Sequence, residues 1–166
     1  MKKFLAISIL MFAFAAVTFG QVSATATATA TIVTPIAIVN ATNMNFGNVA
    51  VNATPGTVVL APAGTRTATG GVTLPGVAGT VTAATFTVTG TVNATYSISL
   101  PSAATTITSG SNNMTVTTFT STPTPTGTLT AGTETLRVGA TLNVAGSQPA
   151  GLYVSGTPFT VTVNYN

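Results

Sequence analysis

The chain has 166 residues, of which four are basic and one is acidic, and it contains neither histidine nor cysteine. This composition excludes a disulfide framework, thiol chemistry and the clustered cations that binding to nucleic-acid phosphates requires. The chain also lacks the titrating side chains that acid–base and nucleophilic catalysis require, so we do not expect an enzyme. We expect no cofactor and no metal site, because the single carboxylate, Glu134, cannot supply a set of ligands.

The first twenty residues have the pattern of a secretory signal peptide. Lys2 and Lys3 precede the apolar stretch Phe4–Val17, and small residues stand before Gln21. A membrane anchor is the alternative, but no later stretch resembles a second span. We therefore expect a signal peptide over residues 1–20, a single domain over residues 21–166 and no integral membrane span after signal removal. The predicted location is secreted, extracellular or at the cell surface, with the periplasm in transit.

A strict alternation of period two runs from Ala24 to Val39 and predicts a long β-strand. Threonines occupy the odd positions from Thr25 to Thr31, and small or aliphatic residues occupy most even positions. The even positions form the candidate strand-pairing face, which consists of Ala24, Ala26, Ala28, Ala30, Ile32, Ile36 and Ile38. No helix would keep either row on one side. What this strand pairs with is expected to decide the function.

Further alternating stretches follow at intervals of about ten residues, separated by Gly, Pro and Asn turns. The clearest are Val81–Gly90 with a phase slip at Ala83 and Ala84, Ala94–Leu100, Met114–Phe119, Leu136–Val144 and Phe159–Tyr165. Such a series predicts an antiparallel β-sandwich or barrel with one apolar face to each strand. A β-solenoid is the rival, but it requires a constant repeat length that the chain does not show beyond the first strand.

The predicted surface carries hydroxyls and amides in place of charges. After signal removal the chain keeps two arginines and one glutamate, a net charge of +1. Little electrostatic repulsion then keeps copies apart, so we expect the protein either to self-associate or to reside where aggregation is controlled.

Several segments together resemble a family of secreted bacterial proteins known as domain of unknown function family 4402. They are Ala28–Ile36, Met44–Gly47, Arg66–Val72, Thr95–Ile98, Val138–Leu142 and Phe159–Tyr165. The resemblance covers nearly all of the mature chain and implies bacterial origin, export and a β-sandwich, with no assigned activity.

The long N-terminal strand and the terminal Phe159–Tyr165 strand are more loosely similar to subunits of chaperone–usher and spore-coat-type pili. That similarity implies an immunoglobulin-like β-sandwich that lacks one strand, which the N-terminal extension of the next subunit supplies. The chain departs from the pattern in its mostly alanine donor face and its lack of a disulfide.

Few side chains stand out as binding candidates. Tyr153 lies off the apolar phase of Leu152 and Val154 and is the one candidate for an exposed aromatic contact. Arg66 could pair with Glu134 across strands, although simple solvation of these charges is the preferred interpretation. The Thr25–Thr31 row is also typical of ice-binding surfaces, but one row does not make an array.

Two functions fit these features. The first is a non-catalytic structural or adhesive subunit at the bacterial cell surface that assembles by β-strand addition through its N-terminal strand, with further copies or other surface subunits as partners. The alternative is a monomeric secreted module that binds a ligand, such as a carbohydrate or another surface, through loops such as Gly146–Gly151.

Overall fold

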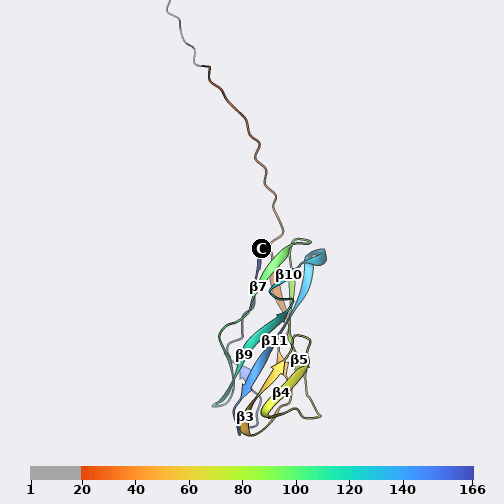
Figure 1. Cartoon of the computed structure of the whole chain (residues 1–166), viewed down its shortest axis with the longest axis vertical. Helices are drawn as coiled ribbons and strands as arrows, with labels where there is room; N and C mark the ends of the chain where they lie inside the picture. The colour runs from red at the N-terminus through yellow and green to blue at the C-terminus, as the bar shows by residue number, and fades with distance from the viewer. Residues whose placement is uncertain (1–19) are drawn as a thin grey trace, which may run out of the picture. The chain divides into compact units, whose positions relative to one another are not determined.

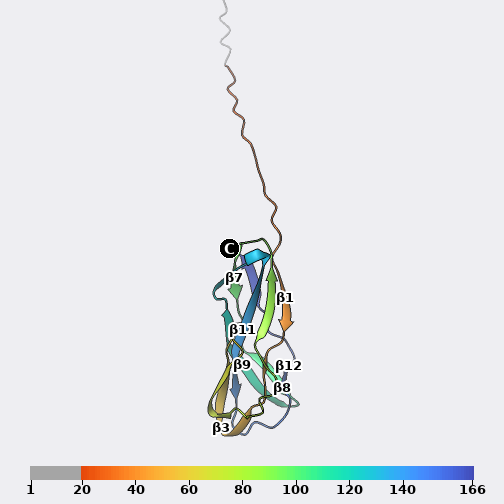
Figure 2. The same cartoon turned by 90° about the vertical axis from the view of Figure 1, so that its right-hand side faces the viewer.

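The computed structural model describes residues 20–166, so the predicted signal peptide over residues 1–20 lies, except for Gly20, outside the described residues (Figures 1 and 2). The chain divides into two units, Met1–Ile32 and Val33–Asn166. The described part of the first unit contains neither helix nor strand, and its residues are exposed. The folded domain therefore begins at Val33, later than the predicted start at residue 21.

The second unit is built almost wholly from β-strands, as the alternating sequence predicts. Its strands are β1 (Ala37–Thr42), β2 (Asn45–Phe46), β3 (Ala50–Leu60), β4 (Arg66–Thr73), β5 (Val81–Thr82), β6 (Ala84–Thr89), β7 (Thr95–Ser99), β8 (Thr105–Ser109), β9 (Asn112–Thr122), β10 (Thr126–Thr128), β11 (Thr133–Val144), β12 (Val154–Ser155) and β13 (Thr162–Tyr165). A single 3-10 turn, Thr130–Gly132, precedes β11.

The strands form one large antiparallel sheet and two small ones. The large sheet has the order β1-β6-β11-β9-β8-β12, and β3 joins it by pairing with both β11 and β4. The order β10-β7-β13 forms a second sheet, and β2 pairs with β5. The neighbours β1-β6-β11-β9 and β7-β13 match, in chain order, strands A-B-E-D and C-F of the immunoglobulin sandwich. The predicted all-β, immunoglobulin-like sandwich is thus confirmed.

The central strand β11 shows how the sequence produces this arrangement. Its even residues from Leu136 to Val144 are all buried, and most of its odd residues are at least partly exposed. Gly139 is the buried exception among the odd residues. A side chain does not fit there, because a Cβ would lie 2.1 Å from the carbonyl oxygen of Leu60. The first half of β11 pairs with β6 and the second half with β3, while β9 lies along its other edge.

Two apolar clusters fill the sandwich. In the first, Val88, Leu136 and Val138 of the large sheet meet Tyr96 and Val163 of the β10-β7-β13 sheet. In the second, residues of β3, β9 and β11 pack beneath the segment that contains β2. Met44 and Phe119 pack against both clusters and connect them, so the two form one continuous core.

The predicted long N-terminal strand is wrong over Ala24–Ile36, since the first strand, β1, starts at Ala37. Periodicity fixes which side chains share a face, but a strand also needs a neighbour for its backbone hydrogen bonds. Among the described residues, nothing pairs with Ala24–Ile36.

Candidate functional site

The predicted strand-pairing residues fall into two groups. Ile38 lies in β1 opposite Val88 of β6, and both Ile36 and Ile38 pack half-buried against the first core cluster. The remaining candidates belong to the first unit, are exposed and have no ladder partner among the described residues; they are Ala24, Ala26, Ala28, Ala30 and Ile32. Ile32 is 98% exposed, which is unusual for a large aliphatic side chain. The N-terminal segment, residues 21–32, therefore keeps its strand pattern without a strand's contacts.

The point at which this segment joins the domain is held by a tyrosine near the other end of the sequence. The Tyr165 hydroxyl donates to the Thr34 carbonyl oxygen at 2.7 Å and accepts from the Thr91 backbone N–H at 2.7 Å. The Thr91 hydroxyl donates to the same Thr34 oxygen at 3.2 Å. Gly90 makes room, because a Cβ there would lie 2.2 Å from the tyrosine hydroxyl oxygen. Alternation alone places Tyr165 on the apolar face of the Phe159–Tyr165 stretch and does not reveal this anchor.

Strand β13 has one ladder partner among the described residues, β7, which leaves its other edge without a strand. In the immunoglobulin sandwich this edge of strand F carries strand G. Val163 is opposite Ile98, whose N–H bonds to the Pro125 oxygen at 3.0 Å on the far side. Because antiparallel pairs alternate between bonded and non-bonded types, the Val163 N–H and C=O point to the open edge.

An apolar groove of about 1140 Å³ lies in the same domain, on the inner face of the large sheet. Its walls include the β2 segment on one side and residues 148–159 on the other. The apolar side chains that line it include Met44, Phe46, Phe86, Ile107, Met114, Leu142 and Phe159. Phe159, just before β13, packs against Phe119 with ring centroids 4.9 Å apart and against Phe86 at 6.5 Å. The groove thus reaches Phe159, three residues before β13, and exposes part of the core.

Tyr153, the candidate for an exposed aromatic contact, lies in the wall of this groove and is half-buried. Its hydroxyl donates to the Pro149 oxygen at 2.8 Å and lies 3.0 Å from the Gln148 amide nitrogen. Leu152 and Val154, on either side of Tyr153 in the sequence, are on the apolar phase of the alternation but are not buried. Leu152 is 82% exposed and Val154 is 56% exposed. The prediction failed because β12 has only two residues at the edge of the sheet, so turn geometry sets the side-chain directions.

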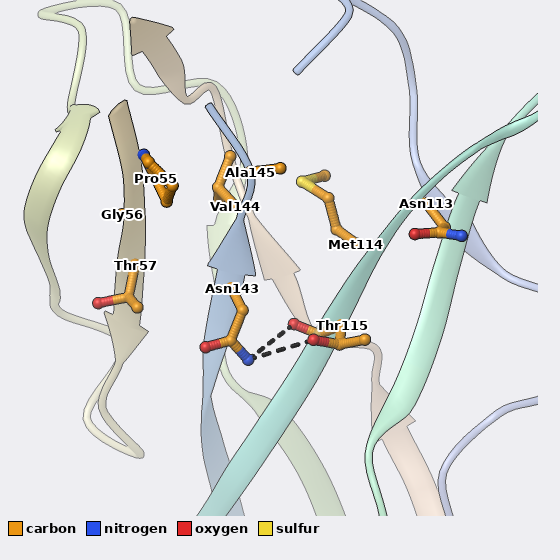
Figure 3. Close-up of a pocket in the computed structure, with 9 residues that line it drawn as sticks. All are labelled: Pro55, Gly56, Thr57, Asn113, Met114, Thr115, Asn143, Val144 and Ala145. Atoms are coloured by element: carbon orange, nitrogen blue, oxygen red, sulfur yellow. Dashed lines mark hydrogen bonds between the residues drawn. The ribbon is translucent and has the colours of Figure 1, made fainter. Parts of the chain in front are cut away.

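A second hollow, of about 610 Å³, lies where β3, β9 and β11 run side by side (Figure 3). Asn143 points across it and donates through its amide to the Thr115 carbonyl oxygen and hydroxyl, both at 3.3 Å, as the dashed lines show. The same amide donates to the Thr117 hydroxyl at 2.9 Å. These hydrogen bonds already occupy the amide's donors, so the hollow offers little for a ligand to bind.

Two of the charged residues, Glu134 and Arg66, make hydrogen bonds that hold parts of the fold together. Glu134 accepts hydrogen bonds from the Tyr96 hydroxyl and the Thr128 N–H, both at 2.8 Å. Burial raises the pKa of Tyr96 above its ordinary value of 10.0, and the hydrogen bond to Glu134 and the charge of that carboxylate raise it further. Tyr96 therefore stays protonated as the donor.

Arg66 does not pair with Glu134. Its guanidinium donates to the carbonyl oxygens of Phe46, of Asn48 at 2.7 Å and of Ala78 at 3.3 Å. The fork of donors suits several carbonyls at once. Arg66 thus ties the loop after β2 to the loop before β5, which is neither cross-strand ion pairing nor simple solvation.

Within residues 20–166, no three or more His, Cys, Asp or Glu side chains come close enough to hold a metal ion. No helix in the described part of the chain has the length and hydrophobicity to cross a membrane. Within the folded domain, the open edge of β13 lies between the groove, which Phe159 lines, and the Thr34 anchor, which Tyr165 holds.

Comparison with known proteins agrees with the resemblance found in the sequence. Neither a search of curated proteins nor one of solved structures found a significant match. The model of a domain of unknown function, DUF4402, matches residues 36–165, nearly the whole of the folded domain. The chain belongs to the DUF4402 family.

Proposed function

We propose that this protein is a secreted, non-catalytic structural or adhesive subunit of the bacterial cell surface, and that it assembles by β-strand addition through its N-terminal segment. The observation that carries the proposal is a mismatch within one chain. Residues 21–32 have the alternation of a strand but no partner among the described residues, while β13 has an edge without a strand.

Physical chemistry favours pairing over solvation for such a segment. β-strand addition gains main-chain hydrogen bonds along the edge and burial of one row of side chains. Residues 21–32 carry no charged side chain, so pairing along the segment requires no desolvation of charged side chains. The exposed Ile32 and the half-buried core residues in the groove would both lose contact with water.

The export and surface location rest on the sequence pattern of residues 1–20. Expression of the full chain in a bacterial host, with mass spectrometry of the cell-free and cell-surface fractions, tests them. A product that begins near Gln21 supports export, whereas an uncleaved product in the cytoplasm contradicts it.

Deletion of Gln21–Thr31 tests assembly. The mature chain, residues 21–166, should form concentration-dependent oligomers or fibres in light scattering and electron microscopy, and the deletion variant should stay folded and monomeric. A control in which Ala26, Ala28 and Ala30 are replaced by proline keeps the length but removes ladder donors, and should behave like the deletion. Persistent monomers of the mature chain at high concentration would contradict the proposal.

A monomeric binding module remains the second candidate, and the groove of about 1140 Å³ is the observation that favours it. Its size suits a small ligand, and apolar walls with a few polar groups such as the Tyr153 hydroxyl are usual in binding sites. A screen of soluble oligosaccharides and apolar probes against the deletion variant tests it. Saturable binding that Leu142→Ala or Tyr153→Ala weakens would support this function.

A further inference from the structure

We infer that the acceptor for the N-terminal segment is the open edge of β13 in a second copy of the chain, and that the segment binds antiparallel to β13 with its alanine row facing the core. This inference rests on the proposed function and specifies its partner and its site. Three observations lead to it: the direction of β13, the parity of its side chains and the groove beside it.

The direction of β13 argues against pairing within one chain. β13 runs from Thr162 to Tyr165, and the Tyr165 hydroxyl bonds to the Thr34 oxygen where the segment joins the domain. A segment that reached Thr34 along its own β13 would have to run parallel to that strand. Parallel pairing is slightly less stable per residue, and the chain would then have to reverse within a few residues that include Pro35 and the core-packed Ile36. A second copy has no such constraint.

Side-chain parity fixes which face of the segment turns inward. On β13 and just before it, Val161 and Val163 are buried, while Thr162 and Asn164 are exposed. An added strand continues these two faces. With its alanines inward, the segment places its threonine row beside Thr162 and Asn164 in water. The opposite orientation would bury a row of hydroxyls without partners, which is costly.

The groove gives the segment space to extend beyond β13, and the small alanine side chains of its inward face fit beside the aromatic residues there. Phe159, three residues before β13, lines the groove and already packs on Phe119 and Phe86, so an added strand that passes it meets a filled part of the core. Ten extended residues span roughly 33 Å, and the five residues 161–165 roughly 16 Å. The segment is therefore long enough to cover the edge and extend past Phe159 along the groove wall.

Cysteine cross-linking tests this arrangement cleanly, because the natural chain has no cysteine. One chain carries a single cysteine in the segment, placed in turn at each threonine from Thr25 to Thr31 and at each alanine from Ala24 to Ala30. The other lacks Gln21–Thr31 and carries Asn164→Cys. Asn164 accepts the Ser97 hydrogen bond through its backbone oxygen, so the side chain can be replaced. Opposite the new strand Asn164 occupies a non-hydrogen-bonded position, where Cα atoms are about 4.5 Å apart, within the range for a disulfide.

We expect disulfide-linked heterodimers from at least one threonine position with Asn164→Cys, and none from the adjacent alanine positions, which face inward. The matched control acceptor is Thr67→Cys, exposed on the edge strand β4. Cross-links to β4 in preference to β13, or links from alanine as readily as from threonine, would overturn the inference. Links only within one chain that carries both cysteines would overturn it as well.

A pair of lysine variants separates this inference from the proposed function. Ala28→Lys places a charge on the inward face and should abolish assembly, whereas Thr27→Lys places the same charge in water and should preserve it. If the mature chain assembles but both lysines are tolerated alike, the inference fails and strand addition at another site stands. If the mature chain never assembles, both fail.

Discussion

Replacement of Tyr165 by phenylalanine tests whether the start of the N-terminal segment is fixed to the domain. The variant keeps the ring, which packs against the first core cluster, and removes only the hydroxyl. That hydroxyl makes two hydrogen bonds, one to the Thr34 oxygen and one from the Thr91 N–H, each 2.7 Å long. At about 1 kcal/mol net for each bond, the loss should lower the free energy of unfolding by about 2 kcal/mol.

Calorimetry in the background that lacks Gln21–Thr31 measures this loss without a contribution from assembly. For a domain of this size, 1 kcal/mol corresponds to roughly 3–5 °C in Tm, so Tyr165→Phe should lower Tm by about 6–10 °C. Tyr153→Phe is the matched control, since its hydroxyl bonds only locally to Gln148 and Pro149, and it should have the smaller effect. A Tm change for Tyr165→Phe no larger than that of the control would refute the anchor.

Three further predictions concern the domain itself. Tyr96→Phe should make the free energy of unfolding fall less steeply at alkaline pH. The pKa of Tyr96 is raised in the folded state, so this residue stabilises the fold fully below pH 10 and less as the pH rises above that, because only the unfolded tyrosine ionises there. In urea unfolding from pH 8 to 11, a dependence of the unfolding free energy on pH equal to that of the wild type would contradict this. Leu136→Ala, at a fully buried position of β11, should cost about 3 kcal/mol, and Val59→Ala, 40% exposed, should cost much less; equal midpoints in urea would contradict the assigned core. Arg66→Lys should speed hydrogen exchange in the loops that flank β2 and β5, because one ammonium cannot replace a fork that reaches three carbonyls; exchange at the wild-type rate would contradict it.

The sequence predicted the strands of the core well because their partners lie within the chain. The alternation from Leu136 to Val144 appears as β11, and the inward residues of the last stretch, Val161 and Val163, are buried as predicted. The phase slip at Ala83 and Ala84 corresponds to the break between β5 and β6. In these stretches a period of two and burial on one face impose the same structure.

The sequence could not predict features that depend on distant residues. The Ala24–Val39 alternation is a property of the segment alone, and no local pattern specifies whether an edge is available to it. The bonds of Arg66 to three carbonyls and of Tyr165 to Thr34 join residues far apart in the chain. The open edge of β13 follows from the strand order of its sheet, β10-β7-β13, which no local pattern specifies.

Hydrogen exchange of residues 21–33, measured over a series of protein concentrations, tests the central claim most directly. If the segment adds as a strand to another copy, its amides should become protected as the concentration rises, with the strongest protection on alternate residues that bond to the neighbouring edge. The folded domain from β1 to β13 should remain protected throughout. Fast exchange of residues 21–33 at every concentration, up to that at which the protein precipitates, would contradict assembly through this segment.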